Sequence, residues 1–384
     1  MDKQIFYGNH FIDEKDIIAV TRALRGEKIT QGKEVLKFEQ NLKFFFGSKY
    51  ASVVSSGTAA LHLSILSLDL KKKDLVITSP ISFLASANCV EYTGGQIDFS
   101  DICPNTYNLD PNKLEDKLKR KKNIKAVIAI DYAGHPSNWK DLNFLKKKYN
   151  FYLINDNCHS LGSKYKNNQK YAVKYADIVT QSFHPVKHIT TGEGGAVITN
   201  NLKIFQKIQS YKNHGIERTM NNYKKYGMWF YKMSNLGYNY RISDINCALG
   251  NSQLSKVNNF IKRRREIAKI YFDFFKDNIN LKLPLENKEI YHSYHLFPLL
   301  VNFQNFKISK KKLFIELARK KINLQVHYIP IHLQPYYKRK YKFKLGDFPV
   351  AENFYKQEIS LPIYKNLTNR NILWISKQIK KLLL

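Results

Sequence analysis

A single lysine stands out in the segment SFHPVKHITTGEGGAVITN, residues 182–200. Lys187 lies between a short strand-like run and a Thr-Thr-Gly-Glu-Gly-Gly stretch that is too flexible for a helix. A lysine held away from water has a lowered pKa, and it can act as a Schiff-base nucleophile or as a base. The alternative is an exposed loop lysine, which composition alone favours in a chain this rich in lysine.

Two other groups with chemical potential also follow strand-like runs. Gly57 and Thr58 of SSGTAAL open an expected helix, whose N–H groups and Thr58 hydroxyl would bind an anion. The same residues also make an ordinary helix cap. Asp156 ends the apolar run of LINDNCHSLG, and His159 follows it. A buried carboxylate needs a cation, but the spacing offers no third ligand for a metal, and hydrogen-bonded structural residues are the ordinary alternative.

Taken together, the three groups match the needs of one cofactor. Pyridoxal phosphate (PLP) needs a cradle for its phosphate, an acid that holds the pyridinium proton, and a lysine that binds its aldehyde. The chain offers these in order as Gly57 with Thr58, Asp156 and Lys187.

These residues must be positioned by the elements around them. Buried strand-like runs alternate with helical stretches up to about residue 250, which predicts an α/β fold with a mostly parallel sheet. Ligands bind at the carboxyl ends of such strands, where the three groups fall. The remaining chain, with a long basic helix and short strands in HLFPLLVNF and NLQVHYI, predicts a smaller α+β domain. We therefore expect a large domain over residues 1–250 and a small domain over residues 251–384.

Two amphipathic helices are expected before the first strand. Apolar residues recur at helical spacing in EKDIIAVTRALRG and in EVLKFEQNLKFFFG, and a glycine closes each stretch. The residues expected to face the core are Ile17, Val20 and Leu24 in the first helix, and Val35, Phe38, Leu42 and Phe45 in the second.

Composition restricts the class of protein. The 384 residues are 43% hydrophobic and carry a formal charge of +32, but the lysines are scattered along helix-like stretches. We interpret them as solvated helix faces rather than as a nucleic-acid site, while the positive field would favour an anionic small substrate. No apolar run is long enough to span a membrane. Without a disulfide framework, a CxxC pair or a signal peptide, a soluble cytoplasmic protein that binds no metal is expected; the cysteines are Cys89, Cys103, Cys158 and Cys247.

The chain resembles the DegT/DnrJ/EryC1/StrS family of PLP-dependent sugar aminotransferases over nearly its whole length. The resemblance implies the type I (aspartate aminotransferase-like) fold. Within the family, DYAGHP, TSPISFLASAN and QVHYIPI look most similar to enzymes that aminate C4 of a UDP-4-keto-6-deoxy-N-acetylhexosamine on the way to pseudaminic acid. The family motifs are ITQGKEVLKFEQNLKFFFG, SSGTAALHL, SPISFLASANCV, DNCHSLGSKY, SFHPVKHITTGEGGAVITN, NLGYNYRISDINCALGNSQL and HYIPIHLQPYY.

The resemblance implies a role for each matched residue in cofactor binding. Lys187 would hold PLP as a Schiff base and later shuttle a proton, Asp156 would pair with the pyridine nitrogen, and His159 would lie near the phenolic oxygen. Phe83 would stack on the ring, an aromatic that the residues alone would place in the core. The phosphate would be held by Gly57, Thr58 and Ser182, and from a second subunit by Asn239.

The resemblance also implies a shared active site and a sugar wall. Asn239 and Arg241 of GYNYR would reach the phosphate from the partner subunit of a homodimer, and Arg241 would equally suit the glutamate donor or the sugar diphosphate. Some relatives carry histidine in place of the lysine and are dehydratases; here Lys187 is present, which favours transamination. The residues that fall in the sugar-binding segments are Tyr7, Thr30, His327 and His332.

The implied activity is a two-step transamination with L-glutamate as donor and a nucleotide-linked keto sugar as acceptor, alternating between PLP and pyridoxamine phosphate (PMP). GDP-4-keto-6-deoxymannose or a 3-keto sugar remains an alternative acceptor. A regulator on the same fold would be expected to lose Lys187 or Asp156. A nucleic-acid-binding protein is motivated by charge alone.

Overall fold

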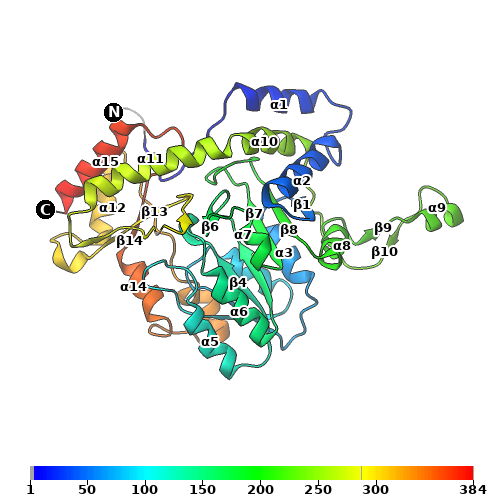
Figure 1. The fold of residues 1–384 in the computed structure, drawn as a ribbon, viewed down its shortest axis with the longest axis horizontal. Coiled ribbons are helices and arrows are strands. Elements are labelled where there is room, and N and C mark those ends of the chain that lie inside the picture. The colour runs from blue at the N-terminus through cyan, green and yellow to red at the C-terminus, as the bar shows by residue number, and fades with distance from the viewer. Residues whose placement is uncertain (1–3, 287, 384) are drawn as a thin grey trace.

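The computed structural model describes residues 4–286 and 288–383. Its centre is a seven-stranded sheet with the order β1-β8-β7-β5-β4-β2-β3 (Figure 1). The strands from β7 to β3 are parallel, whereas β8 runs antiparallel to both of its neighbours. A mostly parallel sheet is therefore confirmed, and β3 is the strand that the sequence pattern did not reveal. The strands are β1 Tyr50–Val54, β2 Leu75–Thr78, β3 Gln96–Phe99, β4 Ile124–Ile130, β5 Tyr152–Asp156, β7 Ile178–Ser182 and β8 Gly195–Thr199.

Every strand of this sheet except the edge strand β3 contributes residues to two separate cores. Leu153 packs on one face and Ile154 on the other, and the same alternation holds along the neighbouring strands. The first face is covered by α2 Lys33–Phe46, α5 Pro111–Arg120, α6 Trp139–Tyr149 and α7 Tyr171–Tyr175. The second face is covered by α3 Gly57–Leu66, α4 Ala85–Glu91, α8 Leu202–Tyr211, α13 Pro335–Tyr341 and α14 Pro349–Gln357.

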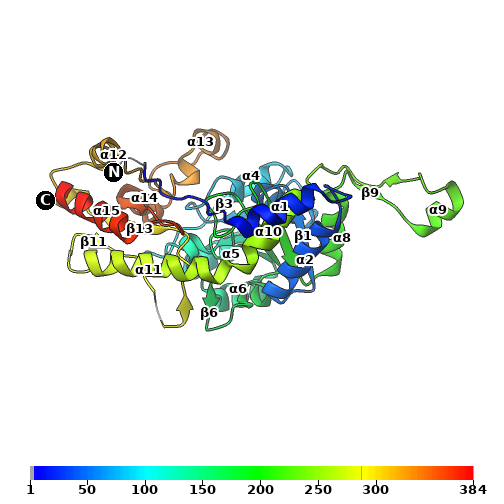
Figure 2. The same ribbon diagram turned by 90° about the horizontal axis from the view of Figure 1, so that it is seen from above.

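A third core forms around the three-stranded antiparallel sheet β11-β13-β14. The helix α11 leads into it, following α10 along the length of the molecule (Figure 2). Ile5 joins this core from the other end of the chain, while α13 and α14 pack on the large sheet, so the boundary at residue 250 stays a prediction. The elements are α10 Asp244–Ser255, α11 Val257–Phe275, β11 Leu281–Lys282, β13 Phe297–Val301, α12 Lys310–Arg319, β14 Glu358–Leu361 and α15 Asn369–Leu382.

Short elements complete the fold. The strand predicted in NLQVHYI is only a bridge between Gln325 and Ser360, because the chain there leaves the sheet after one pairing. No helix among the described residues is long and apolar enough to cross a membrane. The remaining elements are β6 Lys164–Tyr165, β12 Ile290–Tyr291, and the 3-10 turns η1 Tyr132–Gly134, η2 Phe303–Asn305 and η3 Ile331–Leu333.

The first helix, α1 Glu14–Leu24, forms as predicted but buries a different face. Ile17 and Leu24 are 49% and 56% exposed, whereas Asp16 is fully buried. The Asp16 carboxylate accepts a hydrogen bond from Gln253 of α10 at 2.7 Å and pairs with Lys256 at 2.7 Å. The polar contacts with α10 therefore decide which side of α1 faces inward, and its apolar stripe is left on the surface.

A second exposed apolar surface is the arm over residues 216–236, which projects from the body of the protein (Figures 1 and 2). The short strands β9 Ile216–Glu217 and β10 Lys232–Met233 pair at its base, and α9 Met220–Tyr226 lies toward its tip. Met228, Trp229 and Leu236 are about four-fifths exposed. Such a ribbon is marginally stable alone, so the arm needs a surface to pack against.

The buried carboxylate of Asp244 joins α10 to α2. It accepts hydrogen bonds from the backbone N–H groups of Gly32 at 2.7 Å, Glu34 at 2.9 Å and Val35 at 3.3 Å. These are donors at the start of α2 that no preceding helical turn can satisfy. Asp244 thereby caps a helix about 210 residues away in the sequence.

We expect Asp244→Ala to lower the free energy of unfolding by about 2–3 kcal/mol, because buried N–H groups lose a charged acceptor. Asp110→Ala is the matched control, since Asp110 caps its own helix, α5, by accepting a solvent-exposed hydrogen bond from Asn112 N–H. Its cost should be about 1 kcal/mol. Urea unfolding of both variants measures the difference; equal losses would contradict the bridging role of Asp244.

Candidate active site

The candidate site lies where the parallel strands end. Asp156 is the last residue of β5 and Ser182 the last residue of β7, while Gly57 begins the helix that follows β1. Lys187 belongs to the connection between β7 and β8. The sheet therefore gathers at one edge residues that are separated by up to 130 positions, as expected for a parallel α/β sheet.

Lys187 is partly buried, and its amine makes no hydrogen bond or ion pair within residues 4–286 and 288–383. Burial lowers the pKa of Lys187, and the guanidinium of Arg264 lowers it further. The nearby Cys158 and Asp156 act in the opposite direction. The net effect lowers the pKa, which makes the neutral amine easier to reach, and that form acts as a nucleophile or as a proton acceptor.

Asp156 is buried but has no cationic side chain bound to it among the described residues. The Ser86 hydroxyl donates to Oδ2 at 2.9 Å, and the Cys158 N–H donates to Oδ1 at 3.3 Å. Ser86 is itself held by Ser82, with 2.7 Å between the two hydroxyl oxygens. The carboxylate is thus fixed in orientation, and it remains able to accept a proton-bearing nitrogen.

His159 carries a neutral ring with a defined tautomer. The Ala133 N–H donates to Nδ1 at 3.3 Å, so the proton of the neutral ring belongs on Nε2, which lies 3.1 Å from the Tyr328 hydroxyl. Burial holds the pKa of His159 well below its usual value, and Lys187 and His327 add to this effect. His159 therefore offers a neutral N–H rather than a positive charge.

Phe83 is 58% exposed, unlike the aromatic residues of the cores. Its ring centroid lies 6.3 Å from that of Tyr328, beside the Ser82 that supports the Asp156 network. A large aromatic face left open next to a strand-end carboxylate is suited to stacking on a flat ligand ring.

The start of α3 forms a close junction with Ser182. A Cβ atom on Gly57 would come within 2.7 Å of the Ser182 Cβ, so only glycine allows this approach. The Ser56 hydroxyl caps the helix by accepting from Ala59 N–H at 3.0 Å, and Thr58 is partly exposed beside it. Gly57, Thr58 and Ser182 therefore present N–H and hydroxyl donors at a helix N-terminus, as a phosphate requires.

The segment carrying Asn239 and Arg241 approaches this junction only through its backbone. Ser55 N–H donates to the Tyr240 carbonyl at 2.9 Å. Arg241 donates to Asn213 at 2.7 Å, and Asn239 is exposed. In the described part of one chain, neither predicted side chain makes a hydrogen bond to the phosphate-binding residues.

Of the four predicted sugar-wall residues, two lie together. The rings of Tyr7 and His327 are 5.0 Å apart, and His327 is close enough to Lys187 for the lysine to lower its pKa. Thr30 is exposed and pairs with Ser243 instead.

His332 is placed differently from what the resemblance implies. It is fully buried, and its Nε2 lies 3.0 Å from the Glu352 carboxylate. Its ring packs among aromatic side chains of the second core, namely Phe99, Phe343 and Phe348. His332 makes no hydrogen bond or ring contact with the other described site residues; Glu352 binds its Nε2, and its Nδ1 is buried without a partner among the described residues.

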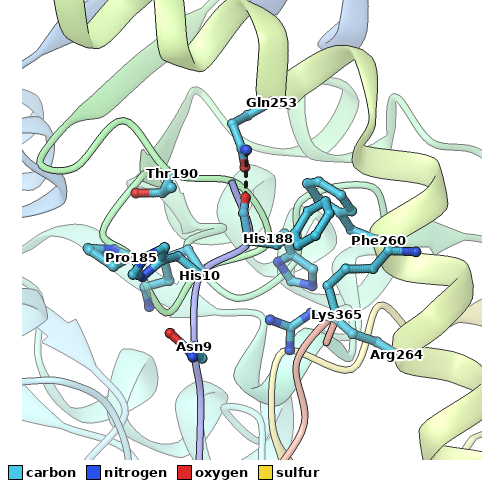
Figure 3. A pocket seen from close by; sticks show the side chains of 11 residues that line it. Asn9, His10, Pro185, His188, Thr190, Gln253, Phe260, Arg264 and Lys365 are labelled. Atoms are coloured by element: carbon cyan, nitrogen blue, oxygen red, sulfur yellow. Dashed lines mark hydrogen bonds between the residues drawn. The ribbon is translucent and has the colours of Figure 1, made fainter. Parts of the chain in front are cut away.

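A narrow cavity lies behind Lys187, on the side of α11 (Figure 3). Arg264 enters it and donates to the carbonyls of Tyr294, His295 and Ile363 at 3.2, 3.1 and 2.8 Å. The lining contains no acid: it is Asn9, His10, Phe11, Pro185, Lys187, His188, Thr190, Gln253, Phe260, Arg264 and Lys365. Burial lowers the pKa of Arg264 to about 10, yet it stays charged and repels a proton from Lys187.

Sequence reasoning did not identify two residues that organise this site. Ser86 orients Asp156, and Tyr328 joins His159 to the Phe83 side of the site. Both lie in motifs that carry the family resemblance, SPISFLASANCV and HYIPIHLQPYY, and a closer look at the neighbours of Phe83 and His327 would have identified them.

Comparison with known proteins assigns the chain. Residues 10–380 match the DegT/DnrJ/EryC1/StrS aminotransferase family. The protein belongs to this family. A UDP-4-amino-4,6-dideoxy-N-acetyl-beta-L-altrosamine transaminase from Campylobacter jejuni is 40% identical over 369 residues, 94% of this chain and 93% of the relative. A GDP-perosamine synthase from Escherichia coli O157:H7 is 33% identical over 354 residues, 92% of this chain and 91% of the relative.

Solved structures agree with the assignment. Helicobacter pylori PseC, an aminotransferase of pseudaminic acid biosynthesis, has a TM-score of 0.91 at 33% identity, with 99% of both chains covered. A putative sugar aminotransferase from Streptococcus pneumoniae in its PLP form has a TM-score of 0.89 at 25% identity, covering 99% of this chain and 98% of the other. The predicted type I aminotransferase fold is therefore confirmed.

The residues present fit the cofactor of a DegT/DnrJ/EryC1/StrS aminotransferase. The Gly57 junction would cradle a phosphate, Phe83 leaves a ring face open, Asp156 has no cation, and the Lys187 amine has no partner among the described residues. Each of these features would be costly or unexplained in a protein that bound nothing here.

We expect Lys187→Met to raise the stability of the cofactor-free protein at neutral pH, because a partly buried amine with a lowered pKa favours the unfolded state. Burial lowers the folded-state pKa, so the unfolded chain binds the proton more readily, and wild-type stability rises as the pH approaches about 10.4. The advantage of the variant should therefore shrink at high pH.

Urea unfolding at pH 7 and at about pH 10 measures this difference. Lys71→Met is the control, since Lys71 is exposed. If the two variants change stability equally at neutral pH, the partial burial of Lys187 does not destabilise the folded state.

Proposed function

We propose that the protein is a PLP-dependent aminotransferase that converts a nucleotide-linked 4-keto-6-deoxy sugar to the 4-amino sugar, with L-glutamate as the amino donor. The observation that carries the proposal is the Lys187 amine, which lies without a partner among the described residues and close enough to Asp156 to feel its charge. Bound PLP would supply an aldehyde that captures amines and a ring that withdraws electrons from the carbon being deprotonated.

The chain's own residues divide the remaining work. Asp156, held by Ser86, would keep the ring nitrogen protonated, and the neutral N–H of His159 would face the phenolic oxygen. Lys187 would first hold the aldehyde and, once released, would accept a proton from the donor Cα and return it to the cofactor carbon that had carried the aldehyde oxygen. The same lysine would reverse the transfer for the keto sugar, so two half-reactions use one base.

Relatives support a UDP-4-keto-6-deoxy-N-acetylhexosamine as the acceptor, in pseudaminic acid and surface-glycan synthesis. The names of the C. jejuni relative and of the H. pylori structure motivate this choice. The E. coli relative keeps GDP-4-keto-6-deoxymannose as the alternative, and a 3-keto sugar is a further one. The excess positive charge of the chain favours either nucleotide diphosphate.

The visible spectrum of the PLP-loaded protein tests the activity directly. L-Glutamate should bleach the yellow absorption to that of the PMP form, and the correct 4-keto sugar nucleotide should restore it. Lys187→Ala should lack the starting absorption and should lower the rate by about a hundred- to ten-thousand-fold. Screening UDP- and GDP-linked keto sugars then identifies the acceptor. A protein that binds PLP but never responds to any amino donor would refute the proposal.

We further propose that two chains form a homodimer with shared active sites. The exposed Met228, Trp229 and Leu236 of the arm need a partner surface, and Asn239 and Arg241 lie at the base of this arm. A second copy would bring these polar residues to the phosphate of the neighbouring site.

Mixing two inactive proteins tests the sharing of residues. A hybrid of Lys187→Ala with Asn239→Ala/Arg241→Ala contains one site in which every residue is intact. An equal mixture should therefore recover about a quarter of wild-type activity after subunit exchange. Differently tagged chains show that exchange has occurred, and exchange without recovery would mean that each site is built from one chain.

A further inference from the structure

A chain of three buried side chains leads from the C-terminal sheet to the site. Glu358 and Ser360 are both fully buried on β14, and because they are two residues apart their side chains share one face. The Ser360 hydroxyl hydrogen-bonds to Glu358 Oε1, and its oxygen lies 2.8 Å from Nδ1 of His327. The order is therefore carboxylate, hydroxyl and imidazole.

This order determines the direction in which each hydrogen bond is donated. A carboxylate only accepts hydrogen bonds, so the single proton of the Ser360 hydroxyl belongs to Glu358. The Ser360 oxygen must then accept from His327, which places the imidazole proton on Nδ1. Burial lowers the pKa of His327 to about 3, so the ring carries only this one proton and Nε2 is a bare acceptor.

The rest of His327 is held just as firmly. Its N–H donates to Glu358 Oε2 at 2.9 Å, and its carbonyl accepts from the Tyr132 hydroxyl at 2.5 Å. The ring packs against Tyr7, with 5.0 Å between centroids, and against Tyr328. Nε2 of His327 has no hydrogen-bond partner among the described residues. Unlike Nδ1 of His188 and His295, it is not among the buried atoms that lack a partner, so it is accessible to a ligand.

We propose that Glu358 and Ser360 are positioning residues that hold His327 in its Nδ1–H tautomer, so that Nε2 accepts a hydrogen bond from an O–H or N–H donor of the nucleotide sugar. The inference rests on the proposed function for the identity of the ligand. The neighbours support it, since Tyr7 lies against the same ring and Tyr328 contacts His159. His327 thus selects for a hydrogen-bond donor at one position of the keto-sugar substrate.

The direction depends on the charge of Glu358, so the groups around this carboxylate matter. Burial raises the pKa of Glu358 to about 7, although the Ser360 hydroxyl, the Lys310 ammonium and the His327 N–H oppose this effect, so Glu358 is a carboxylate above that pH. Lys310 is anchored by donating to the Tyr355 carbonyl at 2.6 Å. The hydroxyls of Tyr107, Tyr132 and Tyr328 also feel the Glu358 charge.

Glu358→Gln should reverse the donor and acceptor roles along these hydrogen bonds without removing any of them. The amide oxygen can still accept from His327 N–H, but the amide nitrogen must now donate to Ser360. The Ser360 proton then turns toward Nδ1, and the imidazole proton moves to Nε2. One isosteric change therefore converts the acceptor at the site into a donor.

Nitrogen NMR of histidine-labelled protein reads the tautomer directly, and His327→Gln identifies the signal. At a pH above neutrality we expect Nδ1–H in the wild type and Nε2–H in Glu358→Gln. An Nε2–H tautomer in the wild type, or an unchanged tautomer in Glu358→Gln, would overturn the proposal. The NMR spectra of the wild type and of Glu358→Gln do not require turnover. They therefore test the tautomer of His327 even if the proposed activity is not found.

The two half-reactions provide the kinetic test. In Glu358→Gln, kcat/KM for the keto sugar should fall about ten- to a hundredfold, because two donors would face each other, whereas the reaction with glutamate should be unchanged. Ser360→Ala should lose the fixed tautomer and show the same selective fall. Ser376→Ala is the control, since that buried hydroxyl bonds only to the Ile372 carbonyl. Equal losses in both half-reactions would show a merely structural role.

Discussion

The register between the central parallel strands determines where the chemistry lies. In β5, Asp156 pairs with Ile130 of β4 on one side and with Thr180 of β7 on the other. Strand side chains alternate between faces, so a slip of one residue would move Asp156 away from Ser86 and exchange the contents of the two cores. The apolar residues on both faces of β5 prevent this slip, because each face has its own set of buried partners. Packing far from the cofactor thus fixes the position of the acid.

The charge state of the site differs from what the net charge of the chain suggests. A net charge of +32 suggests a strongly cationic site, yet burial lowers the pKa of the lysine and keeps the nearby histidines in their neutral forms. His159, His188, His295 and His327 all have lowered pKa values for this reason. Arg264, whose pKa burial lowers only to about 10, stays charged and lines the same cavity as the lysine. The site therefore works through the direction of its N–H groups and lone pairs rather than through bulk charge.

The sequence allowed the sheet, Lys187 and Asp156 to be predicted because strand runs and their last residues are local features. It did not reveal which face of α1 is buried, since that depends on contacts of Asp16 with Gln253 and Lys256 that are distant in the chain. His332 was grouped with His327 by proximity in one motif, but a turn of backbone between them directs the former into an aromatic core. The role of Glu358 and Ser360 was not predicted from the sequence, because alternating residues along a strand indicate only which of them are buried.

The N-terminal segment forms its hydrogen bonds with residues that are synthesised near the end of translation. Ile5 exchanges backbone hydrogen bonds with Lys321 and Asn323, and the Tyr7 carbonyl accepts from Ile363 N–H at 3.0 Å. Translation at the usual bacterial or eukaryotic rate separates Tyr7 from Ile363 by tens of seconds. The first residues made are therefore among the last to find their native neighbours. A ribosome-bound chain can therefore pair all seven strands of its large sheet while the segments that bind Ile5 and Tyr7 are still unmade, so its N-terminal segment waits for the end of synthesis.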